Sequence, residues 1–305
     1  MGEEIDEVFR ERRRLLSLAY RMTGTLAEAE DIVQETYLRW YRLDDEQRAE
    51  VVNVAGWLTR TASRVALDVL GSAWHRRERY VGQWLPEPVP ADLFAGTASE
   101  HARSVTAAHA STDPLERVTL DEAVGTALLL VLEAMTPAER VAFVLHDVFG
   151  VPFDEVAEIV GRTPAAVRQL AATGRRHVRE NRTSVVPPSE HDAAVRAFRD
   201  ASRTGDIAQL MRVLAPDVHL RADGGGHVNA ARNVVTGADR VARFLLGVGA
   251  KQPALVATEQ RVADGLGLVF RHGDATTAVM SFHVEAGLIT DVWIMLNPTK
   301  LTVWT

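Results

Sequence analysis

The sequence predicts a multidomain protein in which two all-α domains precede an α+β domain, and three observations carry this fold class. Residues 1–80 and 116–186 keep apolar side chains at the spacing of amphipathic helices. Prolines interrupt that pattern from Pro86 and again at Pro187, so two boundaries divide the chain. Beyond the second boundary, apolar and polar residues alternate as they do in strands, between repeated glycines.

The first all-α domain is expected over residues 1–80 and contains three predicted helices. Apolar residues at helical spacing over 15–22 predict the first of them. Thr25, with a glutamate three residues further on, predicts a capping box at the start of the second. The polar and acidic segment 43–53 is expected to be a loop, and the third helix is predicted over 54–77.

Residues 81–115 are expected to be a linker, because three prolines forbid a continuous helix there. The second all-α domain follows over residues 116–186, with helicity resuming near its start. Thr136, again with a glutamate three residues on, predicts a capping box. A short helix over 153–160, a turn with a glycine and a basic helix opening at Thr163 together predict a helix-turn-helix.

The α+β domain is expected over residues 187–305. Two helical stretches, 192–202 and 207–214, precede segments that alternate like strands. The alternation is clearest over 280–285, and residues 286–287 are suited to a hairpin turn into the next strand. This order of elements predicts a curved antiparallel sheet with accompanying helices.

Composition narrows the classes of protein. The 305 residues are 47% hydrophobic and 25% charged, which excludes wholesale disorder. Cysteine is absent and no HExxH or dinucleotide-binding glycine motif occurs, so we expect neither a metal site nor a cofactor. The N-terminus lacks the apolar segment of a signal peptide, and Ala123–Leu132 is too short to span a bilayer. We therefore expect a cytoplasmic protein without membrane contacts.

The distribution of charge points to two defined contacts with nucleic acid. A net charge of −7 argues against indiscriminate binding of nucleic acid. Two basic segments stand out within this acidic chain: Arg60–Arg79 has five arginines against two acidic residues, and Arg162–Arg182 has six against one. Basic segments at two separate places fit contacts with phosphates at two sites.

An acidic helical face is predicted in the first domain. Helical spacing brings Asp31, Gln34, Glu35 and Leu38 near one side of the helix that begins after Thr25. Taken alone, such a pattern is most simply a solvated acidic face. The sharper interpretation is a face that docks on a basic partner.

The run EAEDIVQETYLRWY at residues 28–41 resembles conserved region 2 of bacterial RNA polymerase sigma factors, and residues 57–77 are similar to its continuation. The resemblance implies that the four residues of the acidic face bind the polymerase. It also implies that the following basic helix, interleaved with aromatic residues, holds the −10 promoter element as a single strand. Arg64 and Gly71 stand where the family commonly has asparagine and arginine. The DNA-binding residues implied here are Asn53, Trp57, Arg60, Arg64, Arg76 and Arg77.

Residues 153–182 resemble sigma region 4, whose helix-turn-helix reads the −35 element in the major groove. The resemblance implies that Arg168 and Gln169 meet base edges, since arginine suits guanine and glutamine suits adenine. Thr173 and Gly174 stand where the family often has arginine and alanine. The phosphate contacts implied are those of Arg175, Arg176 and Arg179.

A short linker between these two regions is the layout of the extracytoplasmic-function sigma factors. Three further runs, YVGQWLPEP at 80–88, DGGG at 223–226 and NPTKL at 297–301, resemble the signature of one subgroup of these factors. That subgroup carries a SnoaL-like, cone-shaped C-terminal domain, and the resemblance covers residues 8–303. It implies that the linker docks on that domain and that docking regulates activity. We expect Trp84 to use the close approach that three glycines permit. The interdomain regulatory residues implied are Trp84, Leu85, Pro86, Asp223, Gly224, Gly225, Gly226, Asn297, Pro298 and Lys300.

We therefore predict a sigma factor, not an enzyme, that binds core RNA polymerase and directs initiation on promoter DNA through −10 and −35 recognition. One alternative is a SnoaL-like cyclase or isomerase tethered to a DNA-binding module. A second is a one-component repressor, and an unknown small-molecule ligand in the C-terminal domain also stays open. The acid/base candidates of the enzyme alternative are His219, Asp223, His227, His272, His283 and Asp291.

Overall fold

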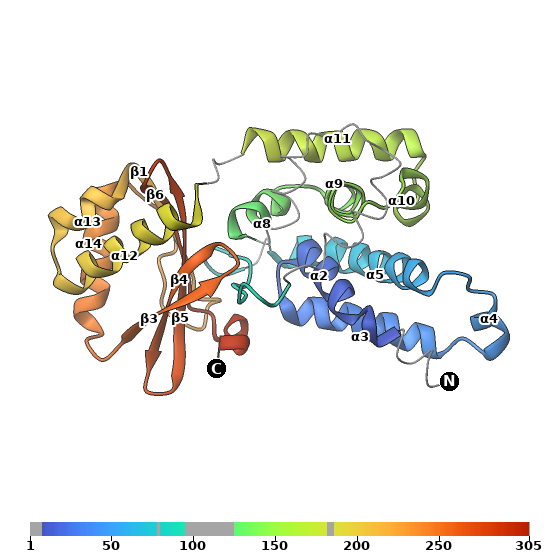
Figure 1. Ribbon diagram of the computed structural model, residues 1–305, viewed down its shortest axis with the longest axis horizontal. Coiled ribbons are helices and arrows are strands. Elements are labelled where there is room, and N and C mark those ends of the chain that lie inside the picture. The colour runs from blue at the N-terminus through green and yellow to red at the C-terminus, as the bar shows by residue number, and fades with distance from the viewer. Residues whose placement is uncertain (1–7, 78–79, 95–124, 182–185, 305) are drawn as a thin grey trace. The chain divides into compact units, whose positions relative to one another are not determined.

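The computed structural model describes residues 8–77, 80–94, 125–181 and 186–304. These residues form two compact units (Figure 1). Within the described ranges, the first unit contains residues 8–76, Phe94 and 128–181, and the second contains Arg77 and residues 80–93, 125–127 and 186–304.

The first part of the first unit is helical, as predicted. It includes α2 (Arg12–Thr23), α3 (Leu26–Tyr41), α4 (Asp45–Ala49) and α5 (Val54–Arg77). Gly24 ends α2 with a φ of 77°, the left-handed conformation that glycine adopts readily at this position. The apolar sides of α2 and α3 pack together, and Trp40 of α3 meets Trp57 of α5 edge-on with ring centroids 5.2 Å apart.

Two local predictions for this part are wrong. The Thr25 side chain accepts no backbone N–H of α3; its hydroxyl donates to the Glu28 carboxylate at 3.1 Å, so the reciprocal pair of a capping box is not formed. Nor is segment 43–53 entirely loop: Asp44 and Gln47 form a capping box that opens the short helix α4. No residue of α4 is buried, so there is no apolar period from which to predict it.

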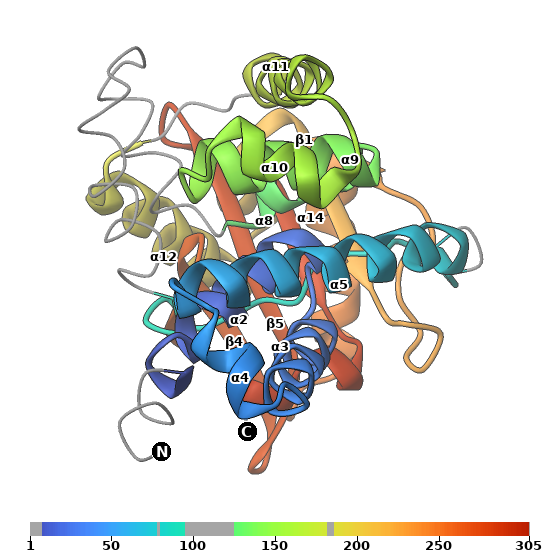
Figure 2. The same ribbon diagram turned by 90° about the vertical axis from the view of Figure 1, so that its right-hand side faces the viewer.

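The later helices are α8 (Thr126–Glu133), α9 (Pro137–Phe143), the π-helical turn η1 (Val144–Val148), α10 (Phe153–Val160) and α11 (Pro164–Glu180). The capping box predicted at Thr136 is confirmed, with the Glu139 carboxylate accepting the Thr136 N–H at 2.9 Å. Gly161 turns the chain between α10 and α11 with a φ of 67°, so the predicted helix-turn-helix is confirmed as well. Figure 2 shows α9, α10 and α11, which contact one another. The predicted resumption of helix near Leu115 lies outside the described residues.

The second unit combines helices with a six-stranded sheet. The strands follow the order β2-β1-β6-β5-β4-β3, and every pairing is antiparallel except that of β1 with β6, which is parallel. The predicted sheet is therefore confirmed, apart from one parallel pair. Its elements are α12 (Pro188–Thr204), α13 (Ile207–Val213), β1 (Leu214–Asp223), β2 (Val235–Thr236), α14 (Ala238–Lys251), β3 (Val256–Val262), β4 (Gly265–His272), β5 (Ala275–Glu285), β6 (Leu288–Met295), η2 (Pro298–Lys300) and η3 (Thr302–Trp304).

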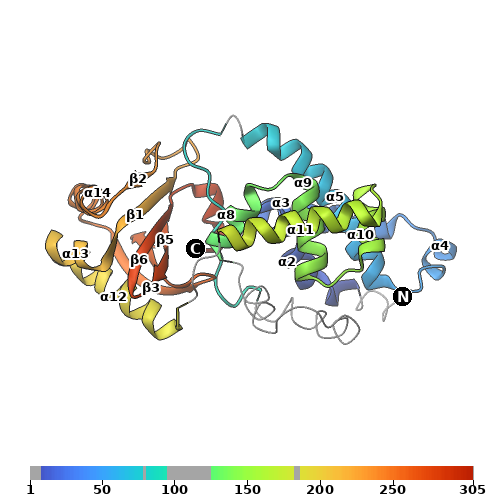
Figure 3. The same cartoon turned by 90° about the horizontal axis from the view of Figure 1, so that it is seen from above.

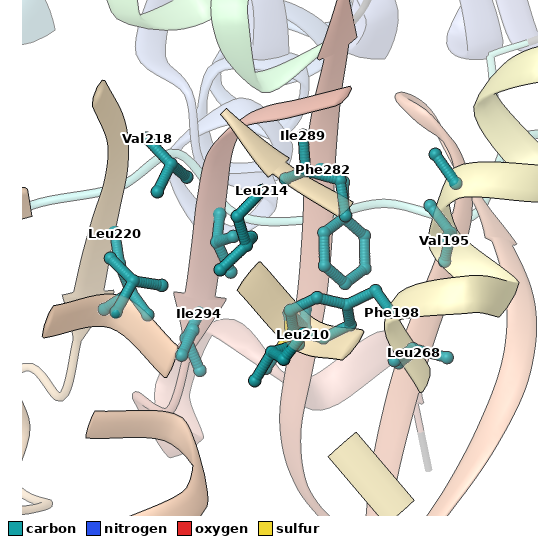
Figure 4. Close-up of a cluster of buried hydrophobic side chains, with 14 of the residues drawn as sticks. Val195, Phe198, Leu210, Leu214, Val218, Leu220, Leu268, Phe282, Ile289 and Ile294 are labelled. Carbon is teal, nitrogen blue, oxygen red and sulfur yellow. The ribbon is translucent and has the colours of Figure 1, made fainter. Parts of the chain in front are cut away.

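The core of the second unit lies between the sheet and helices α12, α13 and α14, which stand on one side of it (Figures 1 and 3). Figure 4 shows this cluster, in which the rings of Phe198 from α12 and Phe282 from β5 pack edge-on with centroids 4.9 Å apart. Both rings are almost fully buried. The strand residues that alternate with this cluster point to the other face of the sheet.

The described part of the linker up to Leu93 belongs to the second unit and packs against its sheet. Leu85 and Val89 are each 1% exposed. The Ala263 N–H donates to the Val89 carbonyl at 3.0 Å, and the Ala91 N–H donates to the Arg261 carbonyl at 3.2 Å. Residues 80–93 are therefore an integral layer of the C-terminal fold.

The predicted fold class, helical domains followed by an α+β domain, is confirmed. The predicted domain boundaries at residues 80, 115 and 186 stay predictions. In the part of the chain that the structure describes, no helix combines the length and apolarity needed to cross a membrane.

Candidate functional site

The predicted polymerase-binding residues share the outer side of α3. Asp31, Gln34 and Leu38 are exposed, while the opposite side of the helix is buried in the unit. Glu35 is partly exposed and its carboxylate accepts a hydrogen bond from Arg39 at 3.0 Å. Leu38 has 45% of its surface exposed, so an apolar side chain lies among acidic and polar ones. Such a surface is suited to a partner that offers both basic groups and an apolar contact.

The residues predicted to bind the −10 element lie on or next to α5. Asn53 caps this helix, since its Oδ1 accepts the Gly56 N–H at 2.8 Å. Arg60 pairs with Glu158 at 3.5 Å and with Glu155 at 3.9 Å, both on α10 of the same unit. Trp57 packs beside Trp40, and the Arg64 guanidinium lies 3.5 Å from the Glu158 carbonyl oxygen. Arg76 and Arg77 lie at the end of α5, where the side chains are not described.

The helix-turn-helix presents four of its five predicted DNA-binding side chains to solvent. Arg168, Gln169, Arg176 and Arg179 are exposed on α11. The Arg168 guanidinium also lies 5.6 Å from the centroid of the Phe153 ring on α10. The Thr163 hydroxyl caps α11 by accepting the Ala166 N–H at 3.2 Å. The start of the basic helix is thereby held in place with its outer side open.

Arg175, whose predicted role at a phosphate stays a prediction, forms an ion pair within the unit. Its Nη1 donates to both carboxylate oxygens of Asp147, at 2.8 and 3.1 Å. Asp147 lies in η1, and a π-helical turn of this kind inserts an extra residue into a helix and redirects its side chains. In this arrangement Arg175 ties α11 to η1, a long-range contact that leaves no trace in the local sequence.

Gly174 has a structural reason to depart from the alanine common in the family. A Cβ atom at this position would lie 2.9 Å from the Cβ of Phe143 on α9, closer than real side chains pack. The glycine therefore lets α11 cross α9 at short range. By contrast, a Cβ atom on Gly71 of α5 would meet nothing within 4 Å.

The linker and C-terminal motifs meet around Asp223, the last residue of β1. This carboxylate is 0% exposed and accepts four hydrogen bonds. Its donors are the Tyr80 hydroxyl at 2.6 Å, the Leu85 N–H at 3.0 Å, the Gly225 N–H at 2.9 Å and the Lys300 ammonium at 2.9 Å. A single buried charge thus joins the linker to both C-terminal motifs.

Lys300 completes this cluster from the other side. Its ammonium donates to the Leu85 carbonyl at 2.6 Å and lies 4.4 Å from the centroid of the Trp84 ring and 5.2 Å from that of Tyr80. The cation is therefore held by one carboxylate, one carbonyl and two aromatic faces. Burial, and then the hydrogen bond to Asp223, raise the pKa of Tyr80 above its ordinary value, so the hydroxyl stays protonated as a donor.

The three glycines after Asp223 serve a different approach from the one expected. A Cβ on Gly225 would lie 2.3 Å from Asn297 Nδ2, and one on Gly224 would lie 2.2 Å from the Val228 carbonyl oxygen. A Cβ on Gly226 would lie 3.4 Å from the Cβ of Val81 in the linker. The close partners of the three glycines are therefore Asn297, the loop itself and Val81, so the linker residue nearest to them is Val81 and not the expected Trp84. Asn297 in turn donates to the Tyr80 hydroxyl at 3.0 Å and accepts the Thr299 N–H at 3.1 Å. Pro298 begins the short helix η2 that carries Lys300.

Sequence reasoning assigned no role to two residues that hold the linker. Tyr80 is the first residue of the linker run, and the Trp304 indole N–H donates to the Pro88 carbonyl at 2.8 Å. The only sequence signal for these hydrogen bonds is weak: a buried tyrosine hydroxyl or tryptophan indole N–H usually finds a hydrogen-bond partner.

The acid/base candidates of the enzyme alternative are not gathered in one cavity. His219, Asp291 and His283 are cross-strand neighbours on β1, β6 and β5, whereas His227 and His272 are exposed and Asp223 is occupied by its four donors. A cavity of about 350 Å³ is lined instead by Pro90, Gln260, Arg261, Arg271, Val303 and Trp304. Over the described ranges, no group of three His, Asp or Glu side chains is arranged to hold a metal ion.

Comparison with known proteins covers almost the whole chain. Residues 8–77 match the family Sigma-70 region 2, and residues 126–178 match Sigma-70, region 4. The chain is 39% identical to the ECF RNA polymerase sigma factor SigJ of Mycobacterium tuberculosis, over 98% of this chain and 93% of that protein. It is 37% identical to the probable ECF RNA polymerase sigma factor SigI of the same species, over 95% and 92%. The crystal structure of M. tuberculosis SigJ is similar with a TM-score of 0.72 and 34% identity, over 99% of each chain.

Proposed function

Because this chain belongs to the extracytoplasmic-function sigma factors, which bind RNA polymerase and act in transcription initiation, we propose how its two units divide that work. The helical unit docks on the core polymerase and recognises promoter DNA. The C-terminal unit regulates this activity by holding the linker, and it does so without catalysing a reaction of its own. We place the protein with its polymerase in the cytoplasm.

Docking on the polymerase is assigned to the outer side of α3. Exposed Asp31 and Gln34 surround the apolar Leu38, and Glu35 lies beside them. Charged groups at the rim of an interface steer association, while a central apolar contact supplies affinity. The match of this face to the polymerase-binding part of region 2 supports docking, and the mixed acidic and apolar surface is compatible with it.

Promoter recognition is assigned to α5 and α11. Trp57 and Arg60 of α5 suit an unstacked −10 strand, which calls for aromatic and basic groups together. On α11, Arg168 and Gln169 are exposed near the capped start of the helix, where side chains reach base edges in a major groove. Arg176 follows two turns later on the exposed side and is assigned to a phosphate.

The observation that carries the regulatory proposal is the Asp223 cluster. One buried carboxylate holds the Tyr80 side chain and the Leu85 backbone of the linker, and it shares Lys300 with the Leu85 carbonyl. A buried ion pair is a specific but costly contact, because each charge loses its hydration and depends on the other. Such a cluster is either fully formed or broken, which makes it suited to a two-state element that regulates the linker.

In vitro transcription with purified core polymerase tests this proposal. Truncation near Pro187 is expected to change the rate of initiation with no ligand added. Trp84→Ala and Asp223→Asn are expected to shift the rate in the same direction as the truncation, because each weakens the hold on the linker. The matched control is Asp274→Asn, which alters an exposed carboxylate in the turn between β4 and β5. A folded truncated chain that initiates at the rate of the full chain contradicts a regulatory role for the C-terminal unit.

A further inference from the structure

Besides the Asp223 cluster, which holds the linker, a second carboxylate of the C-terminal unit, that of Asp264, contacts the chain at Thr126, where the region 4 match begins. Asp264 lies in the turn between β3 and β4. Its Oδ1 accepts the Thr126 backbone N–H at 2.5 Å, and its Oδ2 accepts the Thr126 hydroxyl at 2.7 Å. Both residues belong to the second unit. Thr126 is at the same time the first residue of α8, whose later residues are counted in the first unit.

Asp264 supplies the cap that α8 lacks in its own sequence. The first N–H groups of a helix have no partner within the helix, and a side-chain oxygen at the preceding position usually accepts one of them. For α8 that position is Gly125, which has no side chain. The Asp264 carboxylate accepts the first N–H instead, and its negative charge lies at the positive end of the helix dipole.

Gly125 and Asp264 are matched to each other. A Cβ atom on Gly125 would lie 2.8 Å from Asp264 Oδ1, so residue 125 leaves the space that the carboxylate occupies. Any side chain at this position would push the carboxylate away from the Thr126 N–H. The cap of α8 therefore needs both features: a glycine at position 125 and the carboxylate that the β3–β4 turn supplies.

The turn that carries Asp264 is itself held on two sides. The Ala263 N–H donates to the Val89 carbonyl of the linker at 3.0 Å. Gly265 has a φ of 119°, and a Cβ there would lie 2.9 Å from the His191 ring of α12. With its turn fixed in this way, the carboxylate is preorganised to accept the helix N–H.

We propose that Asp264 is a positioning residue through which the C-terminal unit sets the start of sigma region 4. The proposal rests on the proposed function, in which that unit regulates initiation. Residues 126–178 match region 4, so the helix that Asp264 caps is the first helix of that region. The Asp223 cluster holds residues 80–85 and Asp264 holds Thr126, so the C-terminal unit attaches to the chain both after region 2 and at the beginning of region 4.

Hydrogen–deuterium exchange and transcription on the same full-length variants test this role. Asp264→Ala removes both acceptors, and Gly125→Ala displaces the carboxylate while keeping every hydrogen-bonding group. Both are expected to speed exchange of the amides over 125–130 about five- to thirtyfold, as loss of a helix cap does. Asp264→Asn keeps one acceptor oxygen and is expected to give an intermediate effect. The matched control is Asp274→Ala, at an exposed turn of the same sheet, which is expected to exchange like the unchanged chain.

Initiation with core polymerase is then expected to change in the same direction in Asp264→Ala and Gly125→Ala, with Asp264→Asn between them and the unchanged chain. Unaltered exchange over 125–130 in both disruptive variants would overturn the cap. Faster exchange combined with initiation equal to that of Asp274→Ala would overturn the positioning role. The exchange measurement needs no polymerase, so it stands even if the chain fails to bind core polymerase, an outcome that refutes the proposed function instead.

Discussion

The buried pair of Asp223 and Lys300 predicts an asymmetric response to mutation. Asp223→Asn removes the carboxylate that pairs with the buried Lys300 ammonium, which keeps the Leu85 carbonyl and two aromatic faces. Breaking a buried ion pair from one side costs about 3–5 kcal/mol, and we expect this variant to lie in that range. Lys300→Met leaves Asp223 with three of its four donors, from Tyr80, Leu85 and Gly225. We expect it to cost about 1–3 kcal/mol, as for one lost charge-assisted hydrogen bond.

The double variant measures the coupling between the two charges. Asp223→Asn with Lys300→Met leaves no isolated charge, so its cost is expected to fall short of the sum of the single costs by more than about 1 kcal/mol. Denaturant unfolding read by hydrogen exchange of β1 and β6 reports on the second unit alone. The control is Asp239→Asn, which breaks an exposed pair with Arg243 at 2.9 Å and is expected to leave unfolding unchanged. Costs that add within about 0.5 kcal/mol would refute a coupled buried pair.

Three further outcomes are expected. Gly174→Ala should destabilise the first unit by about 1–3 kcal/mol because the added Cβ would overlap Phe143 of α9. Gly71→Ala should stabilise the same unit by about 1 kcal/mol because alanine favours a helix more than glycine does. Thermal unfolding checks both, since the two variants should shift its midpoint in opposite directions. Arg168→Ala should lose about 1–3 kcal/mol of discrimination at one base pair of the −35 element. Arg176→Ala should weaken binding to all promoter sequences alike and lower the slope of log affinity against log salt concentration by about one. Identical base preferences for Arg168→Ala and the unchanged chain contradict the base contact. Burial raises the pKa of Asp264 from 3.8 to about 6, against the hydrogen bonds from Thr126 and the nearby His191. Because the pKa of Asp264 is higher in the folded than in the unfolded chain, the protonated carboxyl stabilises the fold fully below pH 3.8, and this contribution is lost as the pH rises through 6. The free energy of unfolding of the unchanged chain, relative to that of Asp264→Asn, should therefore fall by about 3 kcal/mol between these pH values. A difference between the two chains that does not depend on pH contradicts the assignment.

Much of the helical architecture follows from local sequence. Apolar residues at helical spacing predicted α2, α3, α5 and α11, because a helix that packs on one side must repeat its apolar residues with its own period. The capping box at Thr136 and the glycine turn at Gly161 were predictable for the same reason: each satisfies backbone groups within a few residues. The short helix α4 was missed because it buries nothing and so has no apolar period.

The linker cluster was predicted in part. Motif resemblance brought the Trp84 run, the Asp223 run and the Lys300 run together, and the structure places them in contact. The chemistry of the contact was not predicted: a buried carboxylate and ammonium carry it, and Gly225 and Gly226 lie against Asn297 and Val81 instead of Trp84. Which atoms meet depends on the path of β1 and η2, and that path is set by packing across the whole sheet.

By itself, the sequence determined the order of helical and α+β segments, the two basic segments and the acidic face of α3, since each is a property of residues close together in the chain. Only the tertiary structure decided that Arg175 pairs with Asp147, that Gly174 lies against Phe143, and that Asp264 caps a helix beginning at Thr126. Each of these contacts joins residues 28 to 138 positions apart. Hydrogen bonds and close packing act over a few ångströms, so they become visible only when the fold has brought such distant residues together.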